Sequence, residues 1–195
     1  MKKTLASLFF LATVFGVHAQ KKITNELIWN SREFNAEYLG GFNSMNDGES
    51  FSDVMASDAN GQTIIQCSFA NGDTLKAITN AKRIFGNEMK AFDNYTFNAD
   101  ESMLLIETES EGIYRWSSMS NYYVHNLATG ASTPIADFKK GKQRLATISP
   151  DKKHVAFVRD SNIFIFTIET KEEKQITFDG DKNKIINGAT DWVYE

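Results

Sequence analysis

The sequence predicts an all-β chain that forms part of a β-propeller. Two stretches, 97–109 and 148–160, superimpose at an offset of 51 residues and place Asp100 on Asp151. Strand-like apolar runs are separated by turn signals such as Asn71-Gly72. The segment 162–168 is apolar on both faces. Sheets that repeat about every 40 to 50 residues and are covered on both faces are typical of propeller blades.

The first twenty residues differ from the rest of the chain. Lys2 and Lys3 precede a mainly apolar stretch, 5–17, and Val17-His18-Ala19 suits cleavage by signal peptidase. The apolar stretch is shorter than the roughly 20 residues that a membrane-spanning helix needs. We therefore expect a signal peptide over 1–19, a periplasmic or secreted mature chain, and no membrane association once the signal is removed.

Residues 20–195 are expected to form the amino-terminal part of one propeller domain, because no linker rich in Pro, Gly or Ser divides them. A weaker copy of the repeat covers 56–79, so about three blades are expected. Further turns are expected at Asn60-Gly61, Thr129-Gly130 and Asp179-Gly180. A closed propeller has at least about four blades. The propeller is therefore expected to be incomplete, as the front part of a longer protein.

The two clear repeats differ by an insertion. Stretches 121–130 and 162–171 superimpose at an offset of 41, so the first copy carries ten extra residues, 110–119. The insertion places Arg115 between Tyr114 and Trp116. A guanidinium stacked on aromatic rings keeps its donors for a carboxylate or a carbonyl. The alternative is a surface arginine whose stem packs on these rings.

The strand expected over 162–168 supports the stacking of sheets. Ile163 and Ile165 are expected on one face, and Phe164, Phe166 and Ile168 on the other. An antiparallel sheet that is apolar on both sides is expected to lie between two others. A jelly roll or another sandwich is the alternative fold, although neither needs an internal repeat.

Several function classes are disfavoured. The formal charge of −4 argues against a nucleic-acid partner. Cys67, as the sole cysteine, cannot form an internal disulfide and is expected to be buried. His125 and His154 lack metal-ligand spacing and are expected at the edge of a blade, so neither a metal nor another cofactor is expected. No G-x-S-x-G motif is present, and no catalytic residue is expected in this chain.

Three stretches resemble the dipeptidyl peptidase IV family, especially its secreted bacterial forms. Residues 113–118 read IYRWSS where the family has Y-R-H-S, and 187–195 read NGATDWVYE where the family has D-W-V-Y-E-E-E. Residues 149–165 are similar to the family's third-blade region. The resemblance covers most of 95–195 and is weak over 21–93. It implies an eight-bladed propeller and an α/β-hydrolase domain that is absent here, and it implies release of Xaa-Pro or Xaa-Ala dipeptides from peptide amino termini.

The resemblance also implies roles for particular residues. Arg115 matches the arginine that hydrogen-bonds the substrate carbonyl and helps to fix the glutamates, with Trp116 in place of the usual His. Glu195 matches the first glutamate of the family's run and is carried over as a neighbour of the two that clamp the substrate ammonium. Asp191, Trp192 and Tyr194 match the motif and are expected to hold the segment in place. The Ser, Asp and His triad has no counterpart.

Two function classes remain open. The first is the amino-terminal part of a secreted serine exopeptidase, inactive by itself, whose substrates are peptides with a free amino terminus and Pro or Ala second. For this class the resemblance allows a homodimer of the full-length protein. The second is a non-catalytic periplasmic propeller that binds a protein partner. The insertion with Arg115 together with the acidic segment at 187–195 favours the first class, since a scaffold has no evident need for both.

Overall fold

The structure is a computed structural model that describes residues 22–34, 41–191 and 193–194. The chain divides into two units, 1–39 and 40–195. In the described part of the first unit, the short helix α1, Asn25–Trp29, begins where the Thr24 side chain accepts a hydrogen bond from the Leu27 N–H. The expected signal peptide, 1–19, lies outside the described residues. Within the described ranges, no helix has the length and apolar character needed to cross a bilayer.

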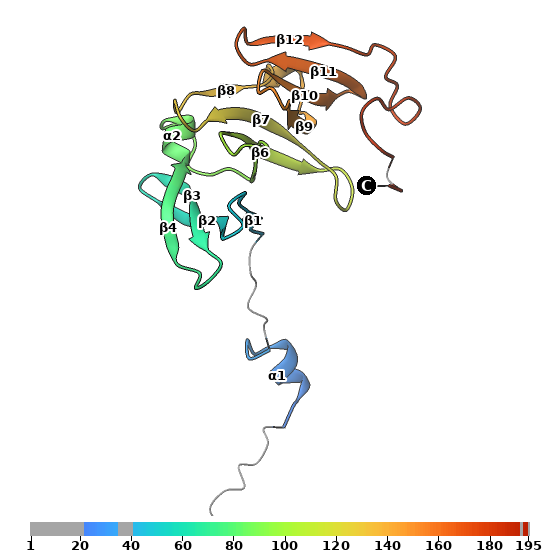
Figure 1. Ribbon diagram of the computed structural model, residues 1–195. Helices are drawn as coiled ribbons and strands as arrows, with labels where there is room; N and C mark the ends of the chain where they lie inside the picture. The colour runs from blue at the N-terminus through green and yellow to red at the C-terminus, as the bar shows by residue number, and fades with distance from the viewer. Residues whose placement is uncertain (1–21, 35–40, 192, 195) are drawn as a thin grey trace, which may run out of the picture. The chain divides into compact units, whose positions relative to one another are not determined.

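The second unit consists of three four-stranded antiparallel sheets, each a simple meander (Figure 1). Its elements are β1 (Asn43–Ser44), β2 (Ser50–Asp58), β3 (Gly61–Ser68), β4 (Thr74–Asn80), α2 (Ala81–Phe85), β5 (Asn94–Phe97), β6 (Met103–Gly112), β7 (Ser118–Asn126), β8 (Ser132–Pro134), the 3-10 helix η1 (Phe138–Lys140), β9 (Arg144–Ile148), β10 (His154–Arg159), β11 (Asn162–Thr167) and β12 (Glu172–Gln175). The expected all-β class and partial propeller are confirmed, and the described residues form three sheets.

Glycines in the left-handed region make three of the four expected turns. Gly61, Gly72 and Gly130 have φ angles of 79°, 75° and 74°, and they join β2 to β3, β3 to β4 and β7 to β8. A glycine adopts this conformation without the steric cost that a Cβ brings. The fourth expected turn, Asp179-Gly180, follows β12 and joins no two strands of the described sheets.

The repeated aspartate marks the same turn in all three blades. Each aspartate accepts a hydrogen bond from the backbone N–H two residues later: Asp47 from Glu49, Asp100 from Ser102 and Asp151 from Lys153, at 2.9, 3.2 and 3.1 Å. The first blade therefore begins at β1, and the repeat expected over 56–79 covers only part of it. The repeat is recognised in the sequence by the apolar strand that it contains. This copy is not recognised in that way, because the residues around Asp47 are polar.

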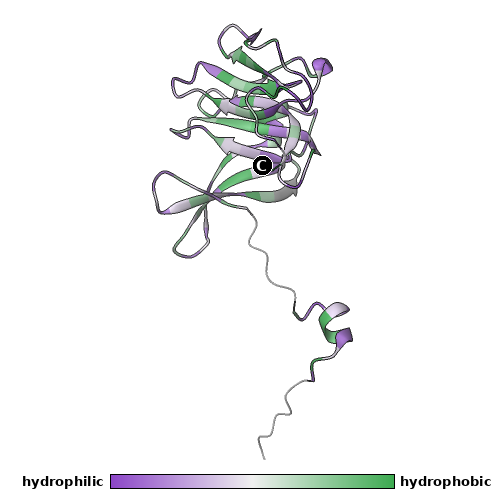
Figure 2. Ribbon diagram, turned by 90° about the vertical axis from the view of Figure 1, so that its right-hand side faces the viewer, coloured by the Kyte–Doolittle hydropathy of each residue, from purple (hydrophilic) through white to green (hydrophobic). Residues whose placement is uncertain are grey.

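The middle sheet is covered on both faces, because side chains alternate between the faces of each strand. One face packs on the first sheet and α2, and the buried residues there are Ile64, Ala81, Ile84, Phe85, Phe92, Tyr95, Leu104 and Ile106. The other face packs on the third sheet through Met103, Leu105, Tyr122, Val124, Ile135, Ala136, Val155, Phe157, Phe164 and Phe166. Figure 2 shows hydrophobic residues along the strands of all three sheets.

The third sheet is only partly covered on its far face. Phe164 and Phe166 are buried against the middle sheet, as expected, whereas Ile163 and Ile165 are half-buried. Part of the far face is covered by the chain at Gly188, which packs on Ile163 and Val158. The expectation that both faces are fully buried is thus met for one face only.

Two polar pairs cross the interface between the first and second sheets. Ser52 Oγ lies 2.9 Å from Tyr95 Oη, and Thr79 Oγ1 lies 3.0 Å from His125 Nε2. His125 is fully buried in β7, the third strand of its sheet. The expectation that His125 lies at a blade edge is therefore wrong. A histidine is tolerated in this interior position because each nitrogen of its ring has a hydrogen-bond partner. Cys67 is buried, as expected.

Candidate functional site

The ten inserted residues extend a hairpin rather than form a separate loop. The β6–β7 ladder is interrupted after Thr108, where Glu109 has a φ of 53°, and it resumes with the pairs Glu111–Met119 and Gly112–Ser118. At the tip, the Ser117 carbonyl accepts hydrogen bonds from two backbone N–H groups, those of residues 113 and 114, at 2.8 and 3.3 Å. The insertion thus projects beyond the sheet on an extension of its two central strands.

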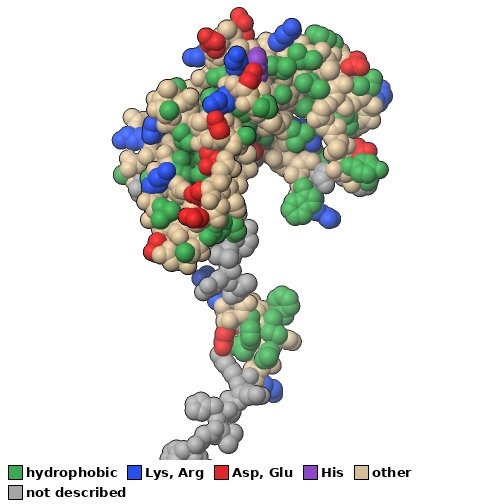
Figure 3. All heavy atoms as spheres, viewed as in Figure 1, with side chains coloured by type: hydrophobic (Ala, Val, Ile, Leu, Met, Phe, Trp, Pro, Cys, Tyr) green, Lys and Arg blue, Asp and Glu red, His purple; other side chains and the backbone are tan. Residues whose placement is uncertain are grey.

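Arg115 lies at this tip and is exposed. Its neighbours Tyr114 and Trp116 expose 50% and 79% of their surface. Figure 3 shows apolar side chains that stand out at the end of this hairpin. Two large rings at a hairpin tip that leave half or more of their surface in water are not explained by packing within this chain alone.

The base of the hairpin is fixed to the third blade. Ser120 and Gln143 exchange two backbone hydrogen bonds of 2.9 Å, and Gln143 is fully buried. The Lys142 ammonium donates to the Glu109 carbonyl and to Glu111 Oε1, the latter at 2.7 Å. The second and third blades therefore hold the extended hairpin in one orientation.

The segment near the end of the chain forms a turn. Asp191 Oδ1 accepts a hydrogen bond from the Val193 N–H at 2.9 Å, and the Asp191 carbonyl accepts one from the Tyr194 N–H at 3.2 Å. These bonds agree with the expectation that Asp191 helps to hold the segment. Trp192 and Glu195 lie outside the described residues, so the roles expected for them stay predictions.

A cavity of about 400 Å³ brings the hairpin and this segment together. Its lining residues come from the hairpin, from the edge strands β5 and β9, from the facing strands β6 and β7, and from the terminal segment: Asn94, Thr96, Leu105, Glu107, Trp116, Ser117, Ser118, Tyr122, Arg144, Leu145, Ala146, Thr190 and Tyr194. In Figure 1 the hairpin and the end of the chain lie on the same side of the unit. Trp116 thus joins Tyr194 at one cavity, and Arg115 lies one residue outside its lining.

The wall supplied by the second blade carries a hydrogen-bonded carboxylate. Glu107 accepts hydrogen bonds from Asn94 Nδ2 and Ser120 Oγ, both at 3.1 Å. Burial raises the pKa of the neighbouring Tyr122, and the negative charge of Glu107 raises it further. Tyr122 therefore stays protonated and remains a hydrogen-bond donor near neutral pH.

The wall supplied by the third blade carries a guanidinium. Arg144 is half-buried at the start of β9, and its Nε is buried without a hydrogen-bond partner. Sequence reasoning missed Glu107, Tyr122 and Arg144. Glu107 and Tyr122 sit opposite each other on one face of the predicted hairpin, which was a usable signal. Arg144 carried none, because its place at this cavity depends on how two blades pack.

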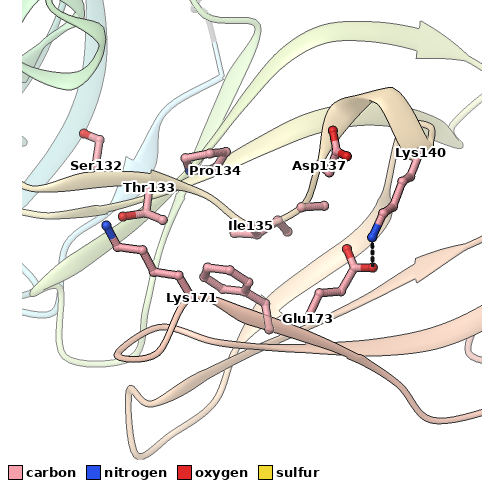
Figure 4. Close-up of a pocket in the computed structure, with 10 residues that line it drawn as sticks. Ser132, Thr133, Pro134, Ile135, Asp137, Lys140, Lys171 and Glu173 are labelled. Atoms are coloured by element: carbon pink, nitrogen blue, oxygen red, sulfur yellow. Dashed lines mark ion pairs between the residues drawn. The ribbon is translucent and has the colours of Figure 1, made fainter.

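A second, larger cavity, about 570 Å³, lies elsewhere. It is formed by β8, the chain that leads into η1, and strands of the third sheet, with the ion pair of Lys140 and Glu173 on its wall (Figure 4). Neither the hairpin nor the terminal segment reaches it. Within the ranges that the structure describes, no group of three or more potential metal ligands is present.

Comparison with known proteins identifies the family. The profile of the family described as "Dipeptidyl peptidase IV (DPP IV) N-terminal region" matches residues 98–195, half of the chain. The chain belongs to this family. The matched region contains the extended hairpin, the third blade and the terminal segment, that is, most of the residues that line the cavity.

Relatives and a solved structure agree with this family. Dipeptidyl peptidase 4 of Trichophyton tonsurans is 35% identical over 54% of this chain, and human prolyl endopeptidase FAP is 32% identical over 52%. The crystal structure of Porphyromonas gingivalis dipeptidyl peptidase 4 matches 90% of this chain with a TM-score of 0.73 and 33% identity. The chain covers 13% of each of the two relatives and 24% of the Porphyromonas chain. Residues 98–195 are thus of the dipeptidyl peptidase IV amino-terminal type, and the chain contains part of a β-propeller.

Proposed function

We propose that this chain is the amino-terminal part of a secreted serine exopeptidase that releases Xaa-Pro or Xaa-Ala dipeptides from peptide amino termini. The observation that carries the proposal is the cavity shared by Trp116 and Tyr194. Trp116 of the hairpin and Thr190 and Tyr194 of the terminal segment line this cavity, and these are the two stretches that an exopeptidase of this family would use to bind the substrate amino terminus. The catalytic triad would belong to an α/β-hydrolase domain outside this chain, so the chain alone would be inactive.

Arg115 and Glu195 have distinct roles in this proposal. Arg115 donates hydrogen bonds to a substrate carbonyl and offsets the mutual repulsion of the clustered carboxylates, which keeps them ionised. Glu195 leads into the pair of carboxylates that binds the substrate ammonium. Carboxylates in a partly desolvated pocket attract an ammonium more strongly than carboxylates in water do, because the effective dielectric constant is lower. The clamp thereby sets the distance from the amino terminus to the cleaved bond.

The hairpin geometry is consistent with this role of Arg115. A binding residue must be held in place while its side chain remains accessible, and here the hairpin base is fixed through Ser120 and Gln143 while the tip is exposed. The two exposed rings beside Arg115 would lose water contact against a bound peptide or a further domain. Such a change stabilises a complex by about 25 cal/mol for each Å² of apolar surface removed from water.

The test uses the full-length protein and an Ala-Pro chromogenic reporter with a free or an acetylated amino terminus. We expect release from the free form only. Arg115→Ala should lower kcat/KM by at least about tenfold. This decrease corresponds to about 1.4 kcal/mol, which is the minimum expected for the loss of one charge-assisted hydrogen bond. Arg32→Ala, which removes another exposed arginine, is the matched control and should leave kcat/KM unchanged.

Two results would contradict the proposal. Wild-type kinetics in the Arg115→Ala protein would remove Arg115 from substrate binding. Absence of dipeptide release by the wild-type full-length protein would instead favour a non-catalytic propeller that binds a protein partner.

A further inference from the structure

Arg144 is a cation without an acceptor in a cavity that the site residues share. Its side chain is half-buried, and its Nε is excluded from water without a hydrogen-bond partner. Among the described residues that line this cavity, Arg144 is the sole Lys or Arg. The part of this half-buried guanidinium that lines the cavity favours an acceptor that enters the cavity, because a cation partly removed from water gains from a charge-assisted hydrogen bond.

The backbone holds Arg144 firmly in this position. The preceding residue, Gln143, is fully buried and exchanges two backbone hydrogen bonds with Ser120 of the second blade. Arg144 itself pairs with Val158 in the third sheet, beside an irregularity in the register. The next residue, Leu145, has a φ of 53° and exposes 56% of its surface. The left-handed conformation is sterically unfavourable for leucine. Leu145 keeps this conformation only because the surrounding structure fixes the backbone.

The carboxylate of the same cavity does not neutralise Arg144. Glu107 lies on the facing wall, and none of the ion pairs among the described residues joins it to Arg144. Glu107 is held by Asn94 and Ser120 instead. One wall of the cavity therefore carries the hydrogen-bonded carboxylate of Glu107, and the other wall carries the guanidinium of Arg144, which is not paired with it.

A carboxylate is the ligand that suits this guanidinium. The planar fork of an arginine matches the two oxygens of a carboxylate, and such charge-assisted pairs are shorter and stronger than neutral hydrogen bonds. Under the proposed function, the amino terminus of the peptide is held beside the terminal segment, whose Tyr194 lines the cavity. The first side chain of that peptide is the part nearest to the bound ammonium and reaches the cavity first.

We propose that Arg144 is a specificity-determining residue that binds an acidic side chain at the first position of the peptide. The substrate class is then Glu-Pro and Asp-Pro peptides in preference to their neutral counterparts. This inference rests on the proposed function, because it uses the same bound amino terminus. It assigns to the cavity a preference that neither Arg115 nor Glu195 supplies.

The experiment compares two reporters that differ in charge and hardly in shape, Glu-Pro-p-nitroanilide and Gln-Pro-p-nitroanilide. In the full-length wild-type protein, kcat/KM should be higher for the Glu reporter, and free Glu-Pro should inhibit better than free Gln-Pro. Arg144→Gln should reduce the Glu-to-Gln ratio of kcat/KM by about tenfold, the effect of about 1.4 kcal/mol. Arg144→Lys should retain part of the preference, since it keeps the charge and loses the fork.

Lys174→Gln is the matched control. It removes one positive charge from the same blade, from the exposed outer strand β12, and should leave the ratio unchanged. If the Glu-to-Gln ratio of kcat/KM is the same in the wild-type and Arg144→Gln proteins, the assignment of Arg144 is overturned. The proposed function is not affected by that result as long as dipeptides are released. A wild-type protein that cleaves Gln-Pro as well as Glu-Pro would overturn it without any variant. Failure to cleave either reporter would overturn the proposed function itself.

Discussion

Thr79 and His125 contact each other across the interface between the first and second blades, with Oγ1 and Nε2 3.0 Å apart. The other ring nitrogen of His125, Nδ1, lies 2.8 Å from Ser132 Oγ. The imidazole is fully buried, so both of its nitrogens are satisfied by hydroxyl groups rather than by water. The pair therefore connects two blades through a neutral histidine.

This contact predicts a dependence of stability on pH. Burial and, to a smaller extent, the positive charge of Arg83 lower the pKa of His125 to about 4. The unfolded chain takes up a proton near pH 6.5 and the folded chain only near pH 4. Stability from this group is therefore present above pH 6.5 and falls as the pH drops from 6.5 to 4, by up to about 1.4 kcal/mol for each pH unit.

Hydrogen exchange of the β4 and β7 amides in the full-length protein measures this effect between pH 7 and 4. His125→Asn should flatten the pH dependence at the first interface. His154→Gln is the control, since His154 is partly exposed and its variant should keep the wild-type profile. A wild-type interface whose protection is constant from pH 7 to 4 would show that His125 does not stay neutral in the fold.

Gly188 predicts a second effect, on the terminal segment. Its φ is 76°, and a Cβ there would lie 2.9 Å from both Ile163 Cγ1 and Val158 Cγ2. Gly188→Ala should push the segment away from the third blade. In the full-length protein kcat/KM should fall by about tenfold or more, because a shift of about 1 Å in a positioning segment can cost up to a hundredfold.

Gly72→Ala separates this contact from the backbone cost. Gly72 has a φ of 75°, and a Cβ there meets nothing within 4 Å. Both variants pay about 1–2 kcal/mol for the left-handed conformation, and only Gly188→Ala adds a collision. Equal kcat/KM values in the two variants would mean that the segment tolerates the added methyl group.

Arg159 and Glu173 predict a third effect, on the third blade. The guanidinium donates to both carboxylate oxygens, at 2.6 and 2.9 Å, and lies 4.2 Å from the Phe164 ring centroid. Arg159 is buried, and its hydrogen bonds lower the pKa of Glu173. Glu173→Gln should lower the free energy of unfolding by about 3 kcal/mol, because it leaves a buried cation without its partner.

The double variant Arg159→Met/Glu173→Leu should lose less than the single variant, since no charge then remains buried. Urea unfolding of the full-length protein, followed at the β10 and β12 amides, provides the measurement. Because the pKa of Glu173 is depressed, the contribution of the pair is present above pH 4.5 and is lost as the pH falls below it. A double variant that is less stable than the single variant would contradict this prediction. It would show that the ion pair adds to the free energy of unfolding beyond the neutralisation of two buried charges.

Local sequence signals predicted much of the fold. The turn glycines Gly61, Gly72 and Gly130 are visible in sequence, because a turn is made by two or three consecutive residues. The repeat around Asp100 and Asp151 predicted equivalent strands, since the alternation of apolar residues is also local. The first blade was placed too late because Asp47 lies between polar residues, and its equivalence appears only in the hydrogen bonds of the turn.

The candidate site was predicted in part. The insertion and the Asp-Trp-Val-Tyr-Glu segment were singled out from the sequence, and the structure brings Trp116 and Tyr194 to one cavity. The roles of Arg115 and Glu195 stay predictions. Glu107 and Tyr122 were missed although they form a cross-strand pair, since neither residue type is unusual on a strand.

By itself, the sequence determined the all-β class, the repeated blade and the family, because each depends on the order of neighbouring residues. Only the tertiary structure decided that His125 is buried between two blades and that Arg144 faces the cavity beside the hairpin. Both depend on which surfaces of separate sheets meet, and residues from 79 to 194 take part in those contacts. A sheet specifies which side chains share its face, whereas the packing of sheets specifies which charges share a cavity.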